Sequence, residues 1–199
     1  MTLEDQPSTV TMDPALWGQI DRLITARVDE RMQSLREDLD RRGPANRATL
    51  VAFSGDMDKL LAAFVIAAGA ATMGMEVSMY FTFWGLTVLK KRTCFKGKPF
   101  LDKLTALMLP AGPDHLGTSR LNLMGMGPAF FGYVMKKRNV ASLRDLIDMA
   151  KASGVRLIAC QMAMEVMGIT RDELIGDLEF GGVATYLADA GDARITLFI

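Results

Sequence analysis

The chain has 199 residues, of which 50% are hydrophobic and 23% are charged, and its formal net charge is zero. This length suits one globular domain with an appended element, and the balanced charge gives no support to nucleic-acid binding. The two cysteines, Cys94 and Cys160, are too few and too far apart for a secreted disulfide scaffold, and neither lies in a CxxC pair. We therefore expect no metal and no cofactor. Residues 1–10 are polar and acidic, unlike a signal peptide, which favours a cytoplasmic protein.

The amino-terminal segment is predicted to be a separate element. Residues 1–13 are expected to be disordered, and Pro14 begins a helical pattern for which Asp13 is a suitable N-cap. Apolar residues three or four positions apart form a narrow stripe on this charged segment: Trp17, Ile20, Ile24, Val28, Met32, Leu35 and Leu39. An amphipathic helix over 14–43 with a stripe of coiled-coil width favours pairing with a second copy of the chain. Packing of this helix against its own domain is the alternative.

Residues 47–199 alternate between strand-like and helix-like segments. Apolar runs predict buried strands at 48–53, 76–83, 155–159 and 194–199. Capping residues and glycines delimit helices over 57–73, 142–153, 161–167 and 183–190, with a shorter one from Thr170 to Gly176. Strands that are apolar on both faces and separated by helices predict an α/β fold. We expect a doubly wound parallel sheet with helices on both faces and right-handed crossovers.

The segment 84–139 is too long for a simple crossover and too apolar for a solvated linker. We expect an insertion that covers the site or builds an oligomer interface. Two uncharged runs, 60–75 and 77–89, are separated by Glu76 and by the helix stop at Gly74. Because a membrane-spanning helix needs about 20 apolar residues, a buried helix followed by a buried strand is favoured over membrane association.

Cys160 stands where a predicted strand passes into a predicted helix. A thiol at this position meets unpaired backbone N–H groups and the positive end of the helix dipole, which favour the thiolate. The thiolate is the form that attacks sulfur, so Cys160 is a candidate sulfur-bearing residue. The alternative is a small buried hydrophobic residue, as many free cysteines are. Glu165 follows by about one helical turn and could face the same site.

Cys94 lies in a basic segment. Its neighbours are Lys90, Lys91, Arg92, Lys96 and Lys98. Nearby cations stabilise a thiolate and would attract anionic sulfur species such as thiosulfate or sulfite. The alternative is that these are ordinary solvated side chains on a loop. The sequence leaves open whether Cys94 and Cys160 approach each other.

Other candidate residues lie outside the two cysteine segments. Ser54, Gly55 and Asp56 follow a strand, at the edge where parallel sheets bind ligands, and predict a small-ligand or nucleotide site. The chain has no GxGxxG, phosphate-loop or GxSxG motif. The single histidine, His115, lies in a Gly/Pro-rich segment and is expected to be a surface or loop residue.

Four sequence blocks carry a resemblance to a known family. They are SGDMDKLLAAFVIAAGAATMG, TCFKGKPFLDKL, GMGP and LIACQMAMEVMGI, and they lie within residues 47–199. Together they resemble the DsrE/DsrF-like family of sulfur-relay proteins, in particular its larger members, which are often labelled DsrE-like or peroxiredoxin-like. The amino-terminal helix lies outside most of the match, and the sequence lacks the TxxC context of a peroxiredoxin.

The resemblance implies a doubly wound α/β domain that assembles into homo-oligomers. It also implies a cysteine that accepts sulfane sulfur as a persulfide and passes it to TusA-type carriers or rhodanese-like proteins. By position, Cys160 is similar to the sulfur-bearing residue, and Cys94 is similar to a second cysteine of the larger members. Many members are carriers, so enzymatic turnover does not follow from the resemblance.

Two functions from different classes therefore compete. The first is a cytoplasmic sulfur carrier or sulfurtransferase, in which Cys160 takes sulfur from a persulfide, polysulfide or thiosulfonate donor and the basic Cys94 segment attracts the anion. The second is a non-catalytic oligomeric scaffold or membrane-docking adaptor, built from the amino-terminal helix and the insertion. A Cys160 sulfur sealed in apolar packing would favour the scaffold.

Overall fold

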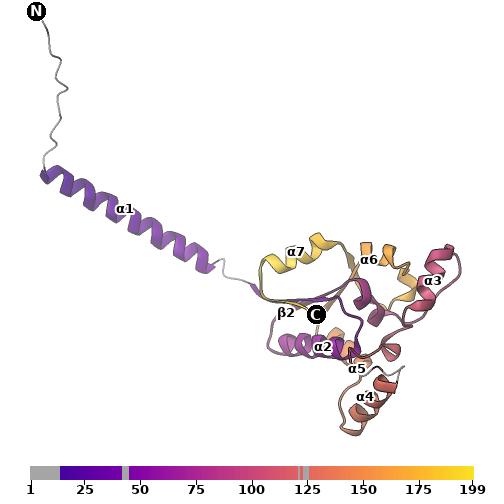
Figure 1. Ribbon diagram of the computed structural model, residues 1–199. Coiled ribbons are helices and arrows are strands. Elements are labelled where there is room, and N and C mark those ends of the chain that lie inside the picture. Colours follow the sequence, from indigo (N-terminus) through magenta and orange to yellow (C-terminus); the bar gives the residue numbers. More distant parts are fainter. Residues whose placement is uncertain (1–13, 42–44, 121, 123–125) are drawn as a thin grey trace, which may run out of the picture. The chain divides into compact units, whose positions relative to one another are not determined.

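The computed structural model describes residues 14–41, 45–120, 122 and 126–199, and the chain divides into two units, residues 1–43 and 44–199 (Figure 1). The predicted disorder of residues 1–13 lies outside the described residues.

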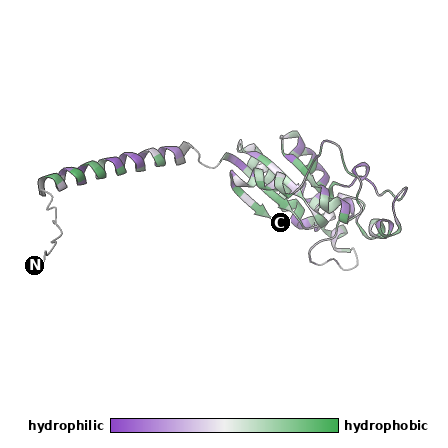
Figure 2. Ribbon diagram, turned by 90° about the horizontal axis from the view of Figure 1, so that it is seen from above, coloured by the Kyte–Doolittle hydropathy of each residue, from purple (hydrophilic) through white to green (hydrophobic). Residues whose placement is uncertain are grey.

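The described part of the first unit is one helix, α1, which spans Pro14–Arg41. Its exposed large apolar side chains are Leu16, Trp17, Leu23, Ile24, Val28, Met32 and Leu35. Apolar and polar residues alternate along this helix in Figure 2. Because tertiary packing normally supplies most of a helix's stability, these exposed apolar groups leave α1 with a surface suited to a partner.

The second unit is built on a sheet of five parallel strands in the order β4-β3-β2-β1-β5. The strands are β1 Ala45–Ala52, β2 Glu76–Phe81, β3 Arg156–Cys160, β4 Glu179–Gly181 and β5 Ala193–Phe198. The predicted parallel α/β sheet is confirmed, with one strand more than the four expected. The additional strand, β4, has three residues including a glycine, so no apolar run marks it in the sequence.

Helices cover both faces of the sheet, as predicted. They are α2 Met57–Thr72, α3 Phe100–Met108, α4 Met126–Lys137, α5 Leu143–Ala152, α6 Gln161–Val166 and α7 Val183–Gly191. Phe64 of α2 stacks on Phe81 of β2, whereas Tyr186 of α7 contacts the preceding strand residue, Tyr80. Because successive strand residues point to opposite faces, α2 and α7 lie on opposite sides of the sheet (Figure 1).

The two uncharged runs form part of the core. In α2 the buried side chains include Leu60 and Phe64, and in β2 every residue from Val77 to Phe81 is buried. No helix in the described part of the chain combines the length and apolarity that crossing a membrane requires. The uncharged stretches are thus explained by burial between the sheet and its helices.

The segment 84–139 is only partly an insertion outside the core. The 3₁₀ turn η1, Phe83–Leu89, begins within the predicted second strand and buries Leu86 and Leu89. Its residue 85 must be glycine, because a Cβ there would collide with the backbone of Ala52. The later elements α3, the 3₁₀ turn η2 Pro113–His115 and α4 are more open.

The exposed side of α3 is strongly apolar. Its exposed large side chains are Phe100, Leu101, Leu104, Leu107 and Met108. Such a set on one short helix is typical of a surface that contacts another molecule.

Candidate functional site

Cys160 is the last residue of β3 and lies beside Gly181 of β4 in the sheet register. It directly precedes α6, so the predicted transition from a strand to a helix at Cys160 is present. Only 3% of the residue is exposed. A reagent therefore reaches the Cys160 thiol only when the surrounding structure opens.

The Cys160 sulfur has a polar neighbour, the hydroxyl of Tyr80 on the adjacent strand. Tyr80 lies beside Ile158 in the register, and Ile158 and Cys160 share a face because they are two positions apart. Burial, followed by the hydrogen bond with the Cys160 side chain, raises the pKa of Tyr80 above its ordinary value. The surroundings of this thiol are thus buried but not purely apolar, and the hydroxyl can donate a hydrogen bond to an anionic sulfur.

Cys94 is the more accessible of the two free cysteines, since it is only half-buried. It lies in the loop 91–99, which follows η1 and therefore the end of β2. Its backbone N–H donates a hydrogen bond of 2.8 Å to Oε1 of Glu173, in the 3₁₀ turn η4 Arg171–Glu173 between α6 and β4. This bond fixes the Cys94 loop to the connection that follows Cys160.

Glu173 is a fully buried carboxylate at the centre of this arrangement. Its Oε2 accepts a bond of 2.6 Å from Lys98 Nζ and bonds of 2.8 and 3.2 Å from the backbone N–H and hydroxyl of Thr170. Burial alone would raise the pKa of Glu173, but the hydrogen bonds from Cys94, Lys98 and Thr170 outweigh it, so the pKa lies below its ordinary value. Glu173 is therefore held as an anion that ties the two segments together.

The backbone adds to this connection. Lys90 and Leu174 form an antiparallel bridge. On one side of it, the N–H of Lys91 donates to the carbonyl of Glu173 at 2.8 Å. On the other side, the N–H of Ile175 donates to the carbonyl of Leu89 at 2.9 Å. The chain that leads into the Cys94 loop thus runs directly alongside the chain that contains Glu173.

The five basic residues around Cys94 divide into an exposed group and a buried group. The interpretation of all five as solvated side chains therefore does not hold for the buried group, and their interpretation as one anion-attracting set does not distinguish the two groups. Lys91, Arg92 and Lys96 are exposed, whereas Lys90 and Lys98 are buried. Lys98 pairs with Glu173, and the Lys90 ammonium donates to Thr93 Oγ1 at 3.2 Å. Burial lowers the pKa of Lys90 below its ordinary value, with Glu173 and Cys94 opposing this effect and Lys98 adding to it.

Glu165 is exposed on α6 and lines a cavity of about 430 Å³ next to the start of α3. The lining residues are Asp102, Gln161, Met164, Glu165, Gly168, Ile169, Thr170 and Arg171. Cys160 is not among them. Glu165 therefore lines a cavity that does not include the buried thiol.

The predicted site at Ser54, Gly55 and Asp56 is a separate cavity of about 400 Å³, bounded also by Trp84 and Pro110. The polar side chains of this cavity bond mainly to one another. The Ser54 hydroxyl bonds to Asp56 Oδ2 at 2.9 Å, and the same carboxylate pairs with Lys59 at 2.7 Å. Neither cysteine lines this cavity, so the structure does not bring the two candidate sites together.

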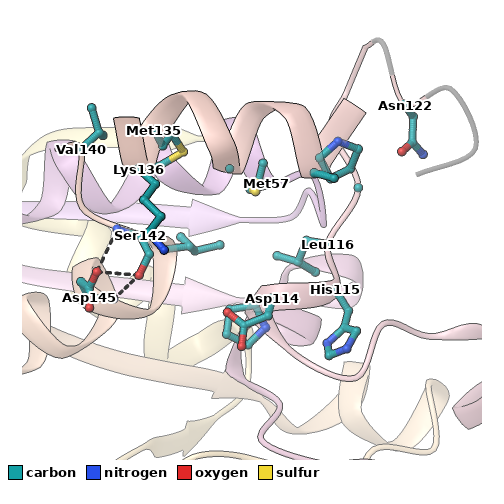
Figure 3. A pocket seen from close by; sticks show the side chains of 16 residues that line it. Met57, Asp114, His115, Leu116, Asn122, Met135, Lys136, Val140, Ser142 and Asp145 are labelled. Carbon is teal, nitrogen blue, oxygen red and sulfur yellow. Dashed lines mark hydrogen bonds between the residues drawn. The ribbon is translucent and has the colours of Figure 1, made fainter. Parts of the chain in front are cut away.

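Another cavity, of about 880 Å³, lies between η2, α4 and the start of α5 (Figure 3). Ser142 and Asp145 cap α5 in its wall, and the exposed His115 ring extends away from them. No cysteine lines this cavity. His115 is thus the surface residue that the sequence predicted.

Tyr80 and Glu173 belong to the site, although no sequence pattern marks either of them as a site residue. In the sequence, Tyr80 is one residue of an apolar strand. It lies near Cys160 only because β2 pairs with β3. Glu173 is visible as part of the capping box with Thr170, which the structure contains. Its bonds to Cys94 and Lys98 join positions more than seventy residues apart and leave no local pattern.

Comparison with known proteins shows the family of this chain. A family model described as the DsrE/DsrF/DrsH-like family matches residues 44–198. The chain is 47% identical over 154 residues to the uncharacterized protein YrkE of Bacillus subtilis, covering 77% of this chain and 96% of that protein. It is 31% identical over 157 residues to the sulfur carrier protein DsrE2 of Allochromatium vinosum, covering 77% and 98%. The solved structure of the ychN protein from E. coli covers 77% of this chain and 98% of its own, with a TM-score of 0.44 and 12% identity.

Proposed function

Because the chain belongs to the DsrE/DsrF/DrsH-like family, we propose that it is a sulfur carrier that holds sulfane sulfur on cysteine and passes it to a partner protein. The similarity to a protein named as a sulfur carrier supports this proposal over the scaffold. A scaffold would need no accessible thiol, whereas Cys94 is one.

The observation that carries the proposal is the placement of the two free thiols. Cys160 ends β3, and Cys94 lies in the loop beyond β2, the neighbouring parallel strand. Both therefore belong to the carboxyl edge of the sheet, where ligands bind in folds of this kind. Their different exposure suggests an order, in which sulfur enters at Cys94 and is then held at Cys160.

Each step is a thiol–persulfide exchange. The Cys94 thiolate attacks the outer sulfur of a donor R–S–SH, the donor S–S bond breaks, and the donor leaves as the thiolate R–S⁻ while Cys94 becomes S–SH. The Cys160 thiolate then attacks the outer sulfur on Cys94, which returns Cys94 to the thiolate. No external oxidant or reductant is consumed. This second step requires the structure around Cys160 to open, because Cys160 is buried.

At Cys160, the Tyr80 hydroxyl and the burial would protect a persulfide. A hydrogen bond from Tyr80 stabilises the anionic sulfur, and the 3% exposure restricts access by thiols from solution. Release to a partner follows the same route in reverse. A persulfide held there should therefore last longer than one on Cys94.

The partners in this proposal are TusA-type or rhodanese-like carrier proteins and small anionic sulfur species. Lys91, Arg92 and Lys96 are exposed around Cys94 and would attract anionic donors. The apolar side of α3 follows this loop directly and supplies a surface for a carrier protein.

The proposal is tested by intact-mass measurement after incubation with polysulfide. We expect the protein to gain the mass of one or more sulfur atoms, and a reducing thiol should remove the gain. The same protein with its thiols blocked by iodoacetamide beforehand is the control. A protein that gains no mass under conditions that load a free thiol would contradict the carrier function.

We also propose that the chain forms homo-oligomers through α1. The exposed residues Ile24 and Val28 lie one turn apart on this 28-residue helix. Replacing both with glutamate should lower the molecular mass in solution, measured by chromatography with light scattering, because two charges would be placed in an apolar contact. Glutamates at Ala26 and Gln33, which face the opposite side of the helix, add the same charge and should leave the mass unchanged. Equal masses for both variants and the wild type would exclude α1 as the contact.

A further inference from the structure

Lys90 is a buried cation without an ion-pair partner. Within the described part of the chain it forms no salt bridge within 4 Å, and its ammonium bonds to the neutral hydroxyl of Thr93. The residue is 1% exposed. Buried lysines are normally paired, because an unpaired charge in the interior is costly. A negative group near the Lys90 ammonium would therefore offset the cost of burying this charge.

The charges around Lys90 do not balance. The Lys90 ammonium bonds to Thr93, the residue directly before Cys94. Glu173 accepts hydrogen bonds from the Cys94 backbone and from Lys98, so Lys90, Lys98, Glu173 and Cys94 form one cluster. Glu173 is engaged at 2.6 Å with Lys98, so two ammonium groups share one carboxylate. Cys94 is the remaining group of this set that can become negative, either as a thiolate or when it carries an anionic sulfur group. An anion at Cys94 would bring the cluster to neutrality.

We infer that Lys90 is a specificity residue that selects anionic sulfur groups at Cys94. The class of ligand is a small group with a terminal negative charge, such as a persulfide anion or a thiosulfonate, in preference to a neutral disulfide. Lys98 does not share this role, because its charge is neutralised by Glu173. The inference rests on the proposed sulfur carriage for the identity of the natural ligand, but the charge selectivity itself does not.

The selectivity is measured with two alkylating reagents of similar size. Iodoacetate is an anion and iodoacetamide is neutral, and both react with the thiolate by displacing iodide. The ratio of their rates at Cys94 therefore cancels the fraction of thiolate and reports the local positive charge. The full-length chain carrying Cys160→Ser provides a single reactive thiol.

In this background, Lys90→Met should lower the iodoacetate-to-iodoacetamide rate ratio by about tenfold, as expected for removing a charge near the sulfur in a poorly screened site. The matched control is Lys103→Met, which removes the same charge from an exposed position on α3 and should change the ratio by less than about twofold. Methionine has nearly the length of lysine, and removing an unpaired buried cation should leave the stability equal or higher.

A ratio that is the same in Lys90→Met, Lys103→Met and the parent would overturn the inference. If Lys90→Met does not fold, Lys90→Gln, which can keep the bond to Thr93, should give the same loss of ratio. Alkylation needs no sulfur donor, so this result is independent of whether the protein carries sulfur. A normal ratio change with no gain of mass from polysulfide would leave the anion selectivity in place and contradict the carrier function alone.

Discussion

Replacing Glu173 with glutamine should lower the free energy of unfolding by about 3–5 kcal/mol at neutral pH, the usual range for removing one partner of a buried ion pair. The amide can still accept hydrogen bonds, but it removes the negative charge. Lys98 and Lys90 then remain as two buried cations without a carboxylate. The Cys94 loop also loses the charge that strengthens its hydrogen bond to Glu173. Urea unfolding measures this loss as a lower midpoint concentration of urea, with an unchanged dependence of the free energy of unfolding on urea concentration.

Two controls isolate the charge. Glu165→Gln makes the same change at an exposed position and should alter stability by no more than about 0.5 kcal/mol. Adding Lys98→Met to Glu173→Gln should recover part of the loss, because it removes one of the uncompensated cations. A Glu173→Gln variant that is destabilised by less than about 1 kcal/mol would contradict the role of this carboxylate.

The stabilisation by Glu173 should also depend on pH. Its folded pKa is depressed, so the folded protein releases this proton more readily than the unfolded chain does. The contribution is therefore fully present above the unfolded value of about 4.3 and is lost as the pH falls through the lower folded value. The stability difference between wild type and Glu173→Gln should shrink across that acidic range. A constant difference would mean that the carboxylate is not ionised in the folded protein.

The second large effect is a difference in reactivity between the two thiols. We expect iodoacetamide to label Cys94 at least about 100-fold faster than Cys160 in the native protein. Cys160 is 3% exposed and is labelled only through an opening of the structure, and a 100-fold ratio corresponds to an opening free energy of about 2.7 kcal/mol. Peptide mass spectrometry over time gives both rates in one sample.

Denaturant provides the control for this comparison. In the unfolded chain both thiols are exposed, so the two rates should converge to within a few-fold. Tyr80→Phe removes the polar neighbour of Cys160 and keeps the ring, so labelling of Cys160 should change while labelling of Cys94 does not. Native rates that are equal for both thiols would show that the burial of Cys160 does not restrict access.

The sequence was sufficient for the fold and for the position of Cys160. The run 155–159 lies between Gly154 and a helix that ends before Gly168, and both glycines adopt positive φ values that suit helix ends. Such local signals specify a strand followed by a helix without any tertiary information. The resemblance to the sulfur-relay family was likewise carried by local blocks, and the family match confirms it.

The burial of the site could not be predicted in this way. Lysines are rarely buried, and nothing in the local sequence distinguishes Lys90 and Lys98 from the exposed basic residues beside them. Lys98 is buried against Glu173, which lies 75 positions further along the chain. Lys90 is buried where its backbone bridges to Leu174, the residue after Glu173. The exposure of Cys160 likewise depends on neighbours from β2 and β4, and β4 is too short to be recognised. Long-range pairing, which leaves no periodic pattern, decides these features.

The most direct test of sulfur carriage is a time course of peptide masses after polysulfide is added to the full-length chain. We predict added sulfur first on the Cys94 peptide and later on the Cys160 peptide, slower loading of Cys160 in Cys94→Ser, and no loading in the variant with both cysteines changed to serine. Loading of that double variant equal to wild type would contradict the sulfur-carrier account. Loading of Cys160 at an unchanged rate without Cys94 would contradict the proposed order.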